Sequence, residues 1–152
     1  SREVSDVYLN LIGRREEKLD PLQAETINLI KNNNRIIEFG QQTDIRPFLK
    51  ASDIFVLPSY REGFPNVVLE AAAMGLPCIV SEVNGATDVI QNNINGLIIP
   101  KRDSEALYQA MKKLYLNSTL RKQMASVARS VVSERFNRMD IWQATLDMYN
   151  SL

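Results

Sequence analysis

The sequence predicts an α/β protein in which a parallel sheet of about five strands is flanked by helices. Two observations lead to this prediction. Up to Pro100, short β-branched apolar runs alternate with longer segments whose apolar residues recur at helical spacing. After Pro100 the alternation stops and only helical patterns follow. Because strands that alternate with helices favour parallel pairing with helices on both faces, we expect a sheet of the Rossmann type.

Five short segments have the character of strands. The first places Val7, Leu9 and Leu11 on one face and stops at Gly13. The third is apolar on both faces and is stopped by Pro58, which is typical of a parallel strand buried on both sides. The predicted strands are 6–13, 35–40, 53–59, 77–81 and 96–100.

Helical patterns fill the segments between the strands and continue to the end of the chain. The second begins with Thr43 or Asp44 as its cap and has Pro47 in its first turn. Gly75 ends the third, and Asp103 is the expected cap of the fifth. The predicted helices are 21–34, 43–52, 66–75, 85–95, 103–117, 118–136 and 138–152.

Length and charge set limits on the function. With 152 residues, 45% of them hydrophobic, the chain can form one domain with a sizeable core, and we predict a single domain over residues 1–152. Lys plus Arg and Asp plus Glu both number 18. A net charge of zero, with the basic residues scattered, gives no basic face, and we therefore expect no nucleic-acid partner.

Residue types that are rare or absent exclude further classes of site. The chain has no histidine, which excludes an imidazole ligand or a Ser-His pair within it, and Cys78 is its single cysteine. Cys78 lies in an apolar run, so we expect a buried, unreactive thiol. No apolar run approaches the ~20 residues of a membrane span, and the first residues are acidic without an apolar core. We expect a cytoplasmic protein.

Two glutamates, Glu62 and Glu70, lie on either side of a predicted helix start in the stretch YREGFPNVVLEAAAMGLPCIV. This turn follows the strand 53–59, so it lies at the carboxyl edge of the sheet, where open α/β sheets bind ligands. The first amides of the helix that starts near Asn66 lack partners within the helix, and phosphate is the anion usually bound there. A carboxylate accepts hydrogen bonds from adjacent sugar hydroxyls. The combination suggests a nucleotide-sugar, with its diphosphate on the amides and one sugar on each glutamate.

Simpler interpretations fit the same pattern. Glu70 also suits a solvated carboxylate favoured by the helix dipole, and Glu62 also suits an exposed ion pair with Arg61. Gly63 and Pro65 are common in loops of any function. The spacing of two glutamates is a weak pattern on its own, so the choice depends on a longer stretch of sequence.

The stretch ASDIFVLPSYREGFPNVVLEAAAMGLPCIVSEVNGATDVI resembles the signature region of the large retaining glycosyltransferase family of GT-B fold, which includes glycogen and sucrose synthases and bacterial mannosyltransferases. The resemblance continues through NGLIIPKRDSEAL and ARSVVSERFN and covers nearly the whole chain. It implies the second, donor-binding domain of a two-domain enzyme. Such an enzyme transfers a sugar, with retention, from a nucleoside diphosphate-sugar to a glycan or glycolipid acceptor in polysaccharide biosynthesis.

The resemblance also implies roles for individual residues. Glu62, as the catalytic glutamate, contacts hydroxyls of the donor sugar, and Glu70 holds the ribose hydroxyls. Amides between them approach the sugar and the diphosphate, and the segment after the second strand resembles the part that meets the nucleobase. The remaining donor-binding residues are Gly63, Phe64, Asn66, Val67, Gly40 and Gln41. Neither a cofactor nor a metal is implied, because the nucleoside diphosphate-sugar is a co-substrate.

The sequence departs from the family pattern at its start. The family's donor domain opens with a strand and a helix that carry an Arg and a Lys for the departing diphosphate, and nothing before SREVSDVYLN matches that strand. Arg14 and Arg15 stand where the family often has a second glycine, and a phosphate contact from either is left open. Asp88 stands where the family often has a glutamate. We therefore expect an N-terminally truncated domain with a gap in its sheet between strands 6–13 and 53–59.

Further expectations concern the parent protein and this fragment. The acceptor would meet an N-terminal domain outside this sequence, at the inner face of the membrane where the acceptor is lipid-linked. The fragment alone would be inactive and would self-associate or be marginally stable, because the gap and the apolar side chains Trp142, Leu146 and Tyr149 are left open. The alternative function is a non-catalytic nucleotide-sugar-binding or interaction module. A sugar-nucleotide epimerase is less favoured, since that chemistry usually relies on histidine.

Overall fold

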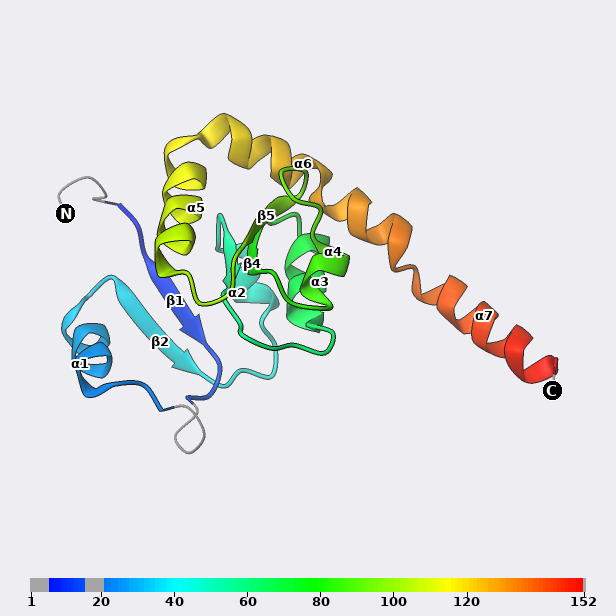
Figure 1. Cartoon of the computed structure of the whole chain (residues 1–152), viewed down its shortest axis with the longest axis horizontal. Coiled ribbons are helices and arrows are strands. Elements are labelled where there is room, and N and C mark those ends of the chain that lie inside the picture. Colours follow the sequence, from blue (N-terminus) through cyan, green and yellow to red (C-terminus); the bar gives the residue numbers. More distant parts are fainter. Residues whose placement is uncertain (1–5, 16–20, 152) are drawn as a thin grey trace. The chain divides into compact units, whose positions relative to one another are not determined.

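The computed structural model describes residues 6–15 and 21–151, and Figure 1 shows the helices and strands that they form. The described residues divide into two compact units, one up to Phe48 and one from Leu49. The strands are β1 (Leu9–Ile12), β2 (Ile36–Gly40), β3 (Phe55–Leu57), β4 (Cys78–Ser81) and β5 (Gly96–Ile99). The helices are α1 (Ala24–Asn32), α2 (Arg46–Lys50), α3 (Asn66–Ala73), α4 (Ala86–Val89), α5 (Ser104–Leu116), α6 (Ser118–Arg135) and α7 (Arg138–Asn150).

The order of these elements confirms the predicted alternation of strands and helices, and every described pair of strands is parallel. The five predicted strands are present, but they lie in two sheets, one of β1 and β2 and one in the order β3-β4-β5. β1 and β3, between which the sequence predicts a gap, are not hydrogen-bonded to each other. The α/β class with helices flanking parallel strands is therefore confirmed.

In the first unit, β1 pairs with β2 so that Leu9 lies opposite Ile36, and the register shifts by one residue between Leu11 and Ile12. α1 connects the two strands, and its Ile30 is buried. None of the residues of β1 and β2 is buried. The side chains of this two-stranded sheet are therefore much more exposed than those of strands in an ordinary protein core.

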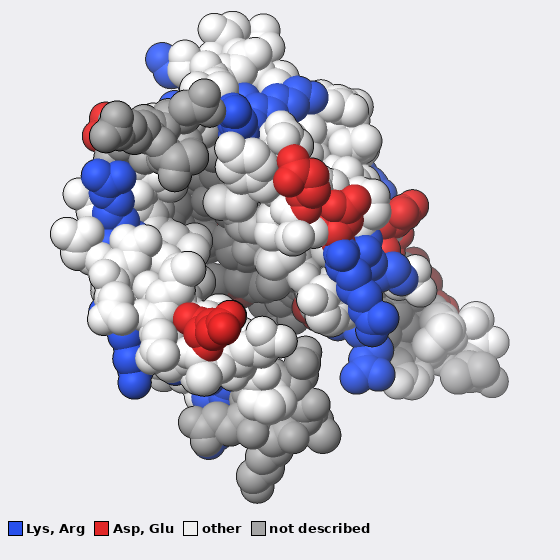
Figure 2. Space-filling view, turned by 60° about the vertical axis from the view of Figure 1, so that its left-hand side comes forward, with Lys and Arg blue, Asp and Glu red and all other residues white. Residues whose placement is uncertain are grey.

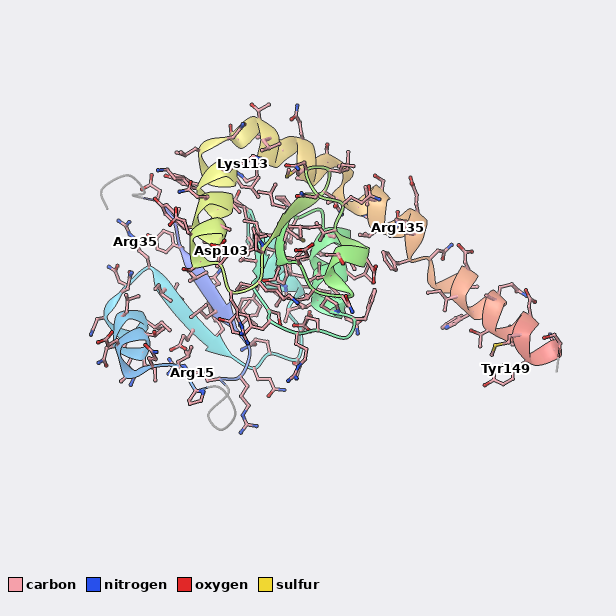
Figure 3. All side chains as sticks on the ribbon, in the orientation of Figure 1. Arg15, Arg35, Asp103, Lys113, Arg135 and Tyr149 are labelled. Carbon is pink, nitrogen blue, oxygen red and sulfur yellow. The ribbon has the colours of Figure 1, made fainter. Side chains whose placement is uncertain are left out.

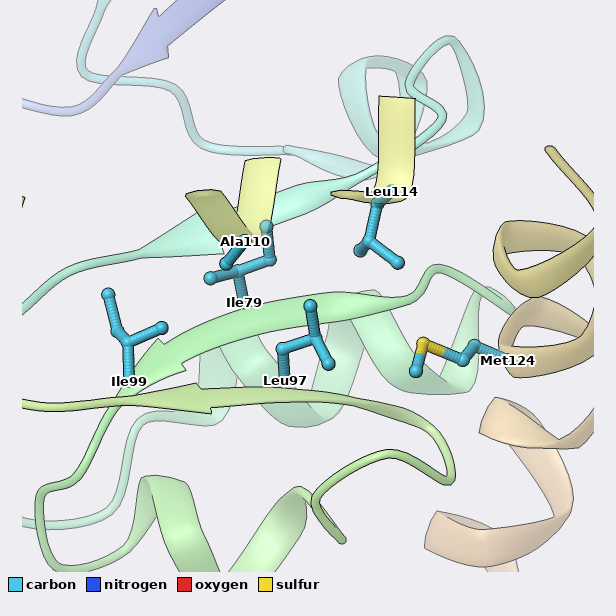
Figure 4. Packing of buried hydrophobic residues seen from close by; sticks show 6 residues of the cluster. All are labelled: Ile79, Leu97, Ile99, Ala110, Leu114 and Met124. Atoms are coloured by element: carbon cyan, nitrogen blue, oxygen red, sulfur yellow. The ribbon is translucent and has the colours of Figure 1, made fainter. Parts of the chain in front are cut away.

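In the second unit, β4 is the central strand of its sheet, and all four of its residues are buried. Because successive side chains of a strand point to opposite faces, this burial means that both faces of the sheet are covered. α5 packs against β4 and β5, and α3 packs against β3, β4 and α6. Figure 4 shows an apolar core cluster, whose buried residues are Ile79, Leu97, Ile99, Ala110, Leu114 and Met124.

Two elements differ from the sequence prediction. β3 is half-buried rather than fully buried, because β4 is its single partner among the described strands. The helix expected over 85–95 ends at Val89, because the buried side chain of Asn95 closes the following loop. Its Oδ1 accepts from the amide of Gln91 at 2.8 Å, and its Nδ2 donates to the carbonyl of Val89 at 3.3 Å.

Two long helices of the second unit, α5 and α6, are joined by a tight corner. Asp103 caps α5 as predicted, since its carboxylate accepts from the amide of Ala106 at 2.8 Å, and Figure 3 shows it at the start of this helix. Asn117 ends α5 and caps α6, because its side chain accepts from the amide of Leu120 at 2.9 Å. The guanidinium of Arg121 donates to the carbonyl of Leu114 at 2.8 Å. These bonds satisfy backbone groups that helix ends leave open.

α7 exposes every side chain that the structure describes in it. Its aromatic and aliphatic residues include Trp142, Leu146 and Tyr149, which are 49%, 56% and 65% exposed. The apolar side chains that the sequence predicts to be open on the last helix are therefore exposed. No helix within the described ranges is both long and apolar enough to cross a membrane.

Candidate donor site

Three connecting segments meet at the carboxyl edge of the sheet β3-β4-β5. Segment 58–65 follows β3, segment 82–85 follows β4, and segment 100–103 follows β5. Because these strands are parallel, their carboxyl ends lie on the same edge. Segment 58–65 contains Glu62 and leads directly into α3, so this turn lies where the sequence predicts it.

The turn before α3 combines exposed and anchored residues. Glu62 is half-buried, Gly63 and Phe64 are exposed, and Pro65 is buried at the N-cap position of α3. The hydroxyl of Ser59 donates to the carbonyl of Arg61 at 3.2 Å, which fixes the chain before Glu62. The middle of the turn is therefore exposed to solvent, whereas its last residue, Pro65, is buried.

The N-terminus of α3 has free amides. The amide of Val68 donates to the carbonyl of Pro65 at 2.9 Å, which closes the first turn of the helix. The amides of Asn66 and Val67 have no acceptor among the described residues. Such amides carry partial positive charge at a helix start and can donate to an anion. These two amides, which would bind an anion, belong to residues that lie between Glu62 and Glu70 in the sequence.

Neither Glu62 nor Glu70 has a hydrogen bond or ion pair within the described part of the chain. Glu70 lies on α3 and is exposed. The ion pair with Arg61 that would explain Glu62 as a surface residue does not form. Both carboxylates are therefore available to accept hydrogen bonds from a ligand. No group of three or more potential metal-ligating side chains occurs among the residues that the structure describes.

Contacts with other segments hold the turn, and sequence reasoning missed them. The ring centroids of Phe64 and Phe136 lie 5.6 Å apart, and Phe136 follows the end of α6. The guanidinium of Arg102, in the segment after β5, lies 5.3 Å from the ring centroid of Tyr60. Gly85, in the segment after β4, lies against the backbone of the turn. A glycine before a short helix is a signal for an unusual backbone angle, but the contacts themselves depend on the tertiary fold.

The residues predicted to meet the nucleobase belong to the first unit. Gly40 ends β2 with a positive φ of 64°, and Gln41 follows it and is exposed. Nothing lies within 4 Å of the position that a Cβ of Gly40 would take, so the backbone there is open to a ligand.

The two arginines near the start differ in their surroundings. Arg14 is exposed. The guanidinium of Arg15 forms an ion pair with Glu38 of β2, in which its Nε donates to Oε1 at 2.7 Å. A phosphate contact from either arginine stays a prediction. Asp88 lies on α4 and is exposed.

Charge is distributed in small groups of either sign on the face shown in Figure 2. The balance of 18 basic and 18 acidic residues is consistent with this view. Near the candidate site, Figure 3 shows Arg135 at the end of α6. Its guanidinium lies 5.4 Å from the ring centroid of Phe136. Binding of an anion at this edge would therefore depend on local groups, such as the amides of α3, rather than on a broad basic surface.

A family model described as "Glycosyl transferases group 1" matches residues 1–117. The chain belongs to this family. The family membership and the fold confirm the resemblance on which the sequence analysis relied.

Individual relatives resemble three quarters or more of the chain. The capsular polysaccharide biosynthesis glycosyltransferase CapM of Staphylococcus aureus is 32% identical over 96% of this chain. The UDP-Gal:alpha-D-GlcNAc-diphosphoundecaprenol alpha-1,3-galactosyltransferase of Escherichia coli is 36% identical over 76% of it. The crystal structure of Anabaena HepE in complex with UDP-glucose superposes with a TM-score of 0.81 over 96% of the chain, at 24% identity.

These matches concern one part of each larger protein. The chain spans 38% of CapM, 30% of the galactosyltransferase and 41% of the HepE chain. The likeness to HepE establishes a shared fold, that of a GT-B glycosyltransferase. The activity of the whole protein, its substrates and its partners are therefore matters of proposal.

Proposed function

We propose that this chain binds the nucleoside diphosphate-sugar donor in a glycosyltransferase that transfers a hexose with retention to a glycan or lipid-linked acceptor. The observation that carries the proposal is the start of α3. Two unpaired carboxylates, Glu62 and Glu70, lie on either side of the free amides of Asn66 and Val67. Carboxylates suit sugar hydroxyls and the amides suit phosphate, so one ligand class satisfies all of these groups.

Each part of the donor has a proposed place. The exposed Glu70 accepts hydrogen bonds from the ribose hydroxyls, and Glu62 accepts them from hydroxyls of the transferred sugar. The diphosphate lies on the amides of Asn66 and Val67, beside Gly63 and Phe64. The resemblance to the family assigns Gly40 and Gln41 to the base. The contacts proposed for the donor are made by carboxylates and backbone amides, and none of them involves a metal or a cofactor.

The contribution of these residues to transfer is binding, orientation and charge stabilisation. As the bond between the sugar and the diphosphate breaks, negative charge grows on the departing phosphate, and the amides at the start of α3 stabilise it. Glu62 orients the sugar so that the acceptor hydroxyl attacks from the side of the leaving group, which retains the anomeric configuration. The acceptor itself would contact the rest of the protein, at the inner face of the membrane when it is lipid-linked.

Two of the similar proteins support a uridine nucleotide as the donor. HepE, which shares the fold, was crystallised with UDP-glucose, and the name of the Escherichia coli relative gives UDP-Gal as its donor. That name also gives a diphosphoundecaprenol-linked acceptor, which supports a lipid-linked acceptor here. We therefore choose UDP-glucose and UDP-galactose as the first ligands to test.

Calorimetric titration of the full-length protein with a UDP-sugar and with UDP tests the assignment. Glu62→Ala should weaken binding of the UDP-sugar by about tenfold or more and leave UDP binding unchanged, because a hydrogen bond to a charged group contributes about 1.5–3 kcal/mol. Glu70→Ala should weaken both ligands by similar factors. Glu25→Ala, which removes an exposed glutamate from α1, is the control. Wild-type affinities in both site variants would overturn the proposal.

Retention needs a separate measurement. The anomeric configuration of the new glycosidic bond, determined by NMR, should equal that of the donor. A product of opposite configuration would leave donor binding intact but remove the retaining mechanism.

A further inference from the structure

Gly85 approaches the turn of Glu62 more closely than any side chain would allow. It precedes α4 with a φ of +78° and a ψ of −48°. A Cβ at this position would lie 2.2 Å from the carbonyl oxygen of Gly63, 2.9 Å from Cδ of Pro65 and 3.0 Å from Cα of Phe64. Two of these atoms belong to the backbone, so no side-chain rotation can relieve the overlap. Any other residue at 85 would therefore push the turn away.

The turn has little freedom to move without changing the position of Glu62. Gly63 is bonded directly to Glu62, and Pro65 is buried at the start of α3. On another side, the Phe64 ring contacts the ring of Phe136. The turn that bears Glu62 is thus continuous with α3 at its end. Two residues distant in the sequence, Gly85 and Phe136, also contact it.

We propose that Gly85 and Phe136 are positioning residues that seat the turn 62–65 and so place the Glu62 carboxylate for the hydroxyls of the donor sugar. The inference rests on the proposed function of Glu62. Gly85 acts through the absence of a side chain, and Phe136 acts through the contact of its ring with Phe64. Neither residue touches the donor itself.

A second explanation for Gly85 is that its positive φ alone requires glycine. Gly75 separates the two explanations, because its φ is +82° while the nearest atom to its added Cβ is the carbonyl oxygen of Ala125, at 3.7 Å. Alanine at Gly75 therefore also has to adopt a positive φ, but it does not displace the turn. Gly75→Ala is the matched control for Gly85→Ala.

The seating itself can be observed without any ligand. In the full-length protein labelled with isotope-enriched glycine, the amide signal of Gly63 is identified by its loss in Gly63→Ala. We expect Gly85→Ala to shift this signal, and Gly75→Ala to leave it in place. An unmoved Gly63 signal in folded Gly85→Ala would overturn the inference.

The consequence for the donor is measured by the ratio of the affinities for UDP-glucose and UDP. Gly85→Ala should reduce this ratio by about tenfold, as Glu62→Ala does. The double variant with Glu62→Ala should show no further loss, because both changes remove the same contact. Full additivity of the two losses, or an unchanged ratio in Gly85→Ala, would contradict the inference.

Phe136→Ala keeps the inference testable if Gly85→Ala does not fold. It removes the ring on the far side of Phe64 without adding atoms, and it should reduce the same ratio by about two- to fivefold. An unchanged ratio in this variant would overturn the role of Phe136. If Glu62→Ala itself leaves the ratio unchanged, the proposed function of Glu62 fails first and the inference fails with it. If Glu62→Ala reduces the ratio and Gly85→Ala does not, the inference alone fails.

Discussion

The two compact units bury their side chains very differently. In the unit from Leu49, all of β4 is buried, and the cluster around Ile79 joins the sheet to α5 and α6. In the unit up to Phe48, none of the residues of β1 and β2 is buried. The residues proposed for the sugar and the diphosphate thus stand on a packed core, and those proposed for the base stand on a lightly buried sheet. Burial of apolar surface is the main source of stability, so we expect the second unit to be the more stable one.

Substitution of one isoleucine in each unit gives the largest expected contrast. Ile79→Ala removes a fully buried side chain of β4 and should lower the free energy of unfolding by about 2–5 kcal/mol. Ile37→Ala removes a side chain of β2 that is 40% exposed and should cost less than about 1 kcal/mol. Urea unfolding, with hydrogen exchange to follow each unit separately, measures both values. Equal costs would mean that the two units do not differ in the way their burial indicates.

Chemical labelling of thiols sharpens the comparison. Burial raises the pKa of Cys78 from 9.0 to about 12, so its thiol stays protonated at neutral pH. We expect alkylation of Cys78 to be roughly a hundredfold slower or more than alkylation of Ile37→Cys, because the buried thiol reacts after local opening. Raised pH should also lower stability: the stabilisation from the protonated thiol is complete below about pH 9 and is lost as the pH rises towards 12. Equal rates for both thiols would contradict the difference in burial.

A smaller effect is expected at the exposed cap of α2. The carboxylate of Asp44 accepts from the side chain and the backbone amide of Arg46, which lowers the pKa of Asp44 from 3.8 to about 2. Its stabilisation is therefore present above pH 3.8 and is lost as the pH falls through about 2. Because the pair is exposed, we expect a small change in melting temperature. Carboxyl NMR titration should show the midpoint rising towards 3.8 in Arg46→Gln, and an unchanged midpoint would exclude the guanidinium as the cause.

The sequence predicted the elements better than their tertiary relations. Local signals were sufficient for the cap at Asp103, the left-handed Gly75 that follows the end of α3 and the burial of Cys78, because caps, left-handed glycines and apolar runs act within a few residues. The division of the strands between two sheets depends on pairing between distant segments, which no local pattern encodes. The short α4 was missed for a similar reason, since Asn95 forms its hydrogen bonds only once the loop has closed.

The candidate site shows the same division. The glutamate pair and the helix start at Asn66 were readable from spacing and from the resemblance to a family. The partners of the turn were not, because Gly85, Arg102 and Phe136 are far from it in the sequence. Gly85 contacts the turn because it lacks a side chain, and a glycine in the sequence does not reveal which segment packs against it.

The corner at Asn117 has a mechanical consequence. It joins α5, which lies against the sheet, to α6, whose far end carries Phe136 against Phe64 of the turn. A helix of 18 residues is about 27 Å long, so a rotation of about one degree at the corner moves the far end by about 0.5 Å. If repacking around Met124 or Leu114 rotates α6 slightly about the corner, the displacement is therefore largest at the far end of the helix. That is where the ring of Phe136 contacts the turn. We expect the Gly63 amide signal to register such core substitutions, although they lie in another layer of the molecule.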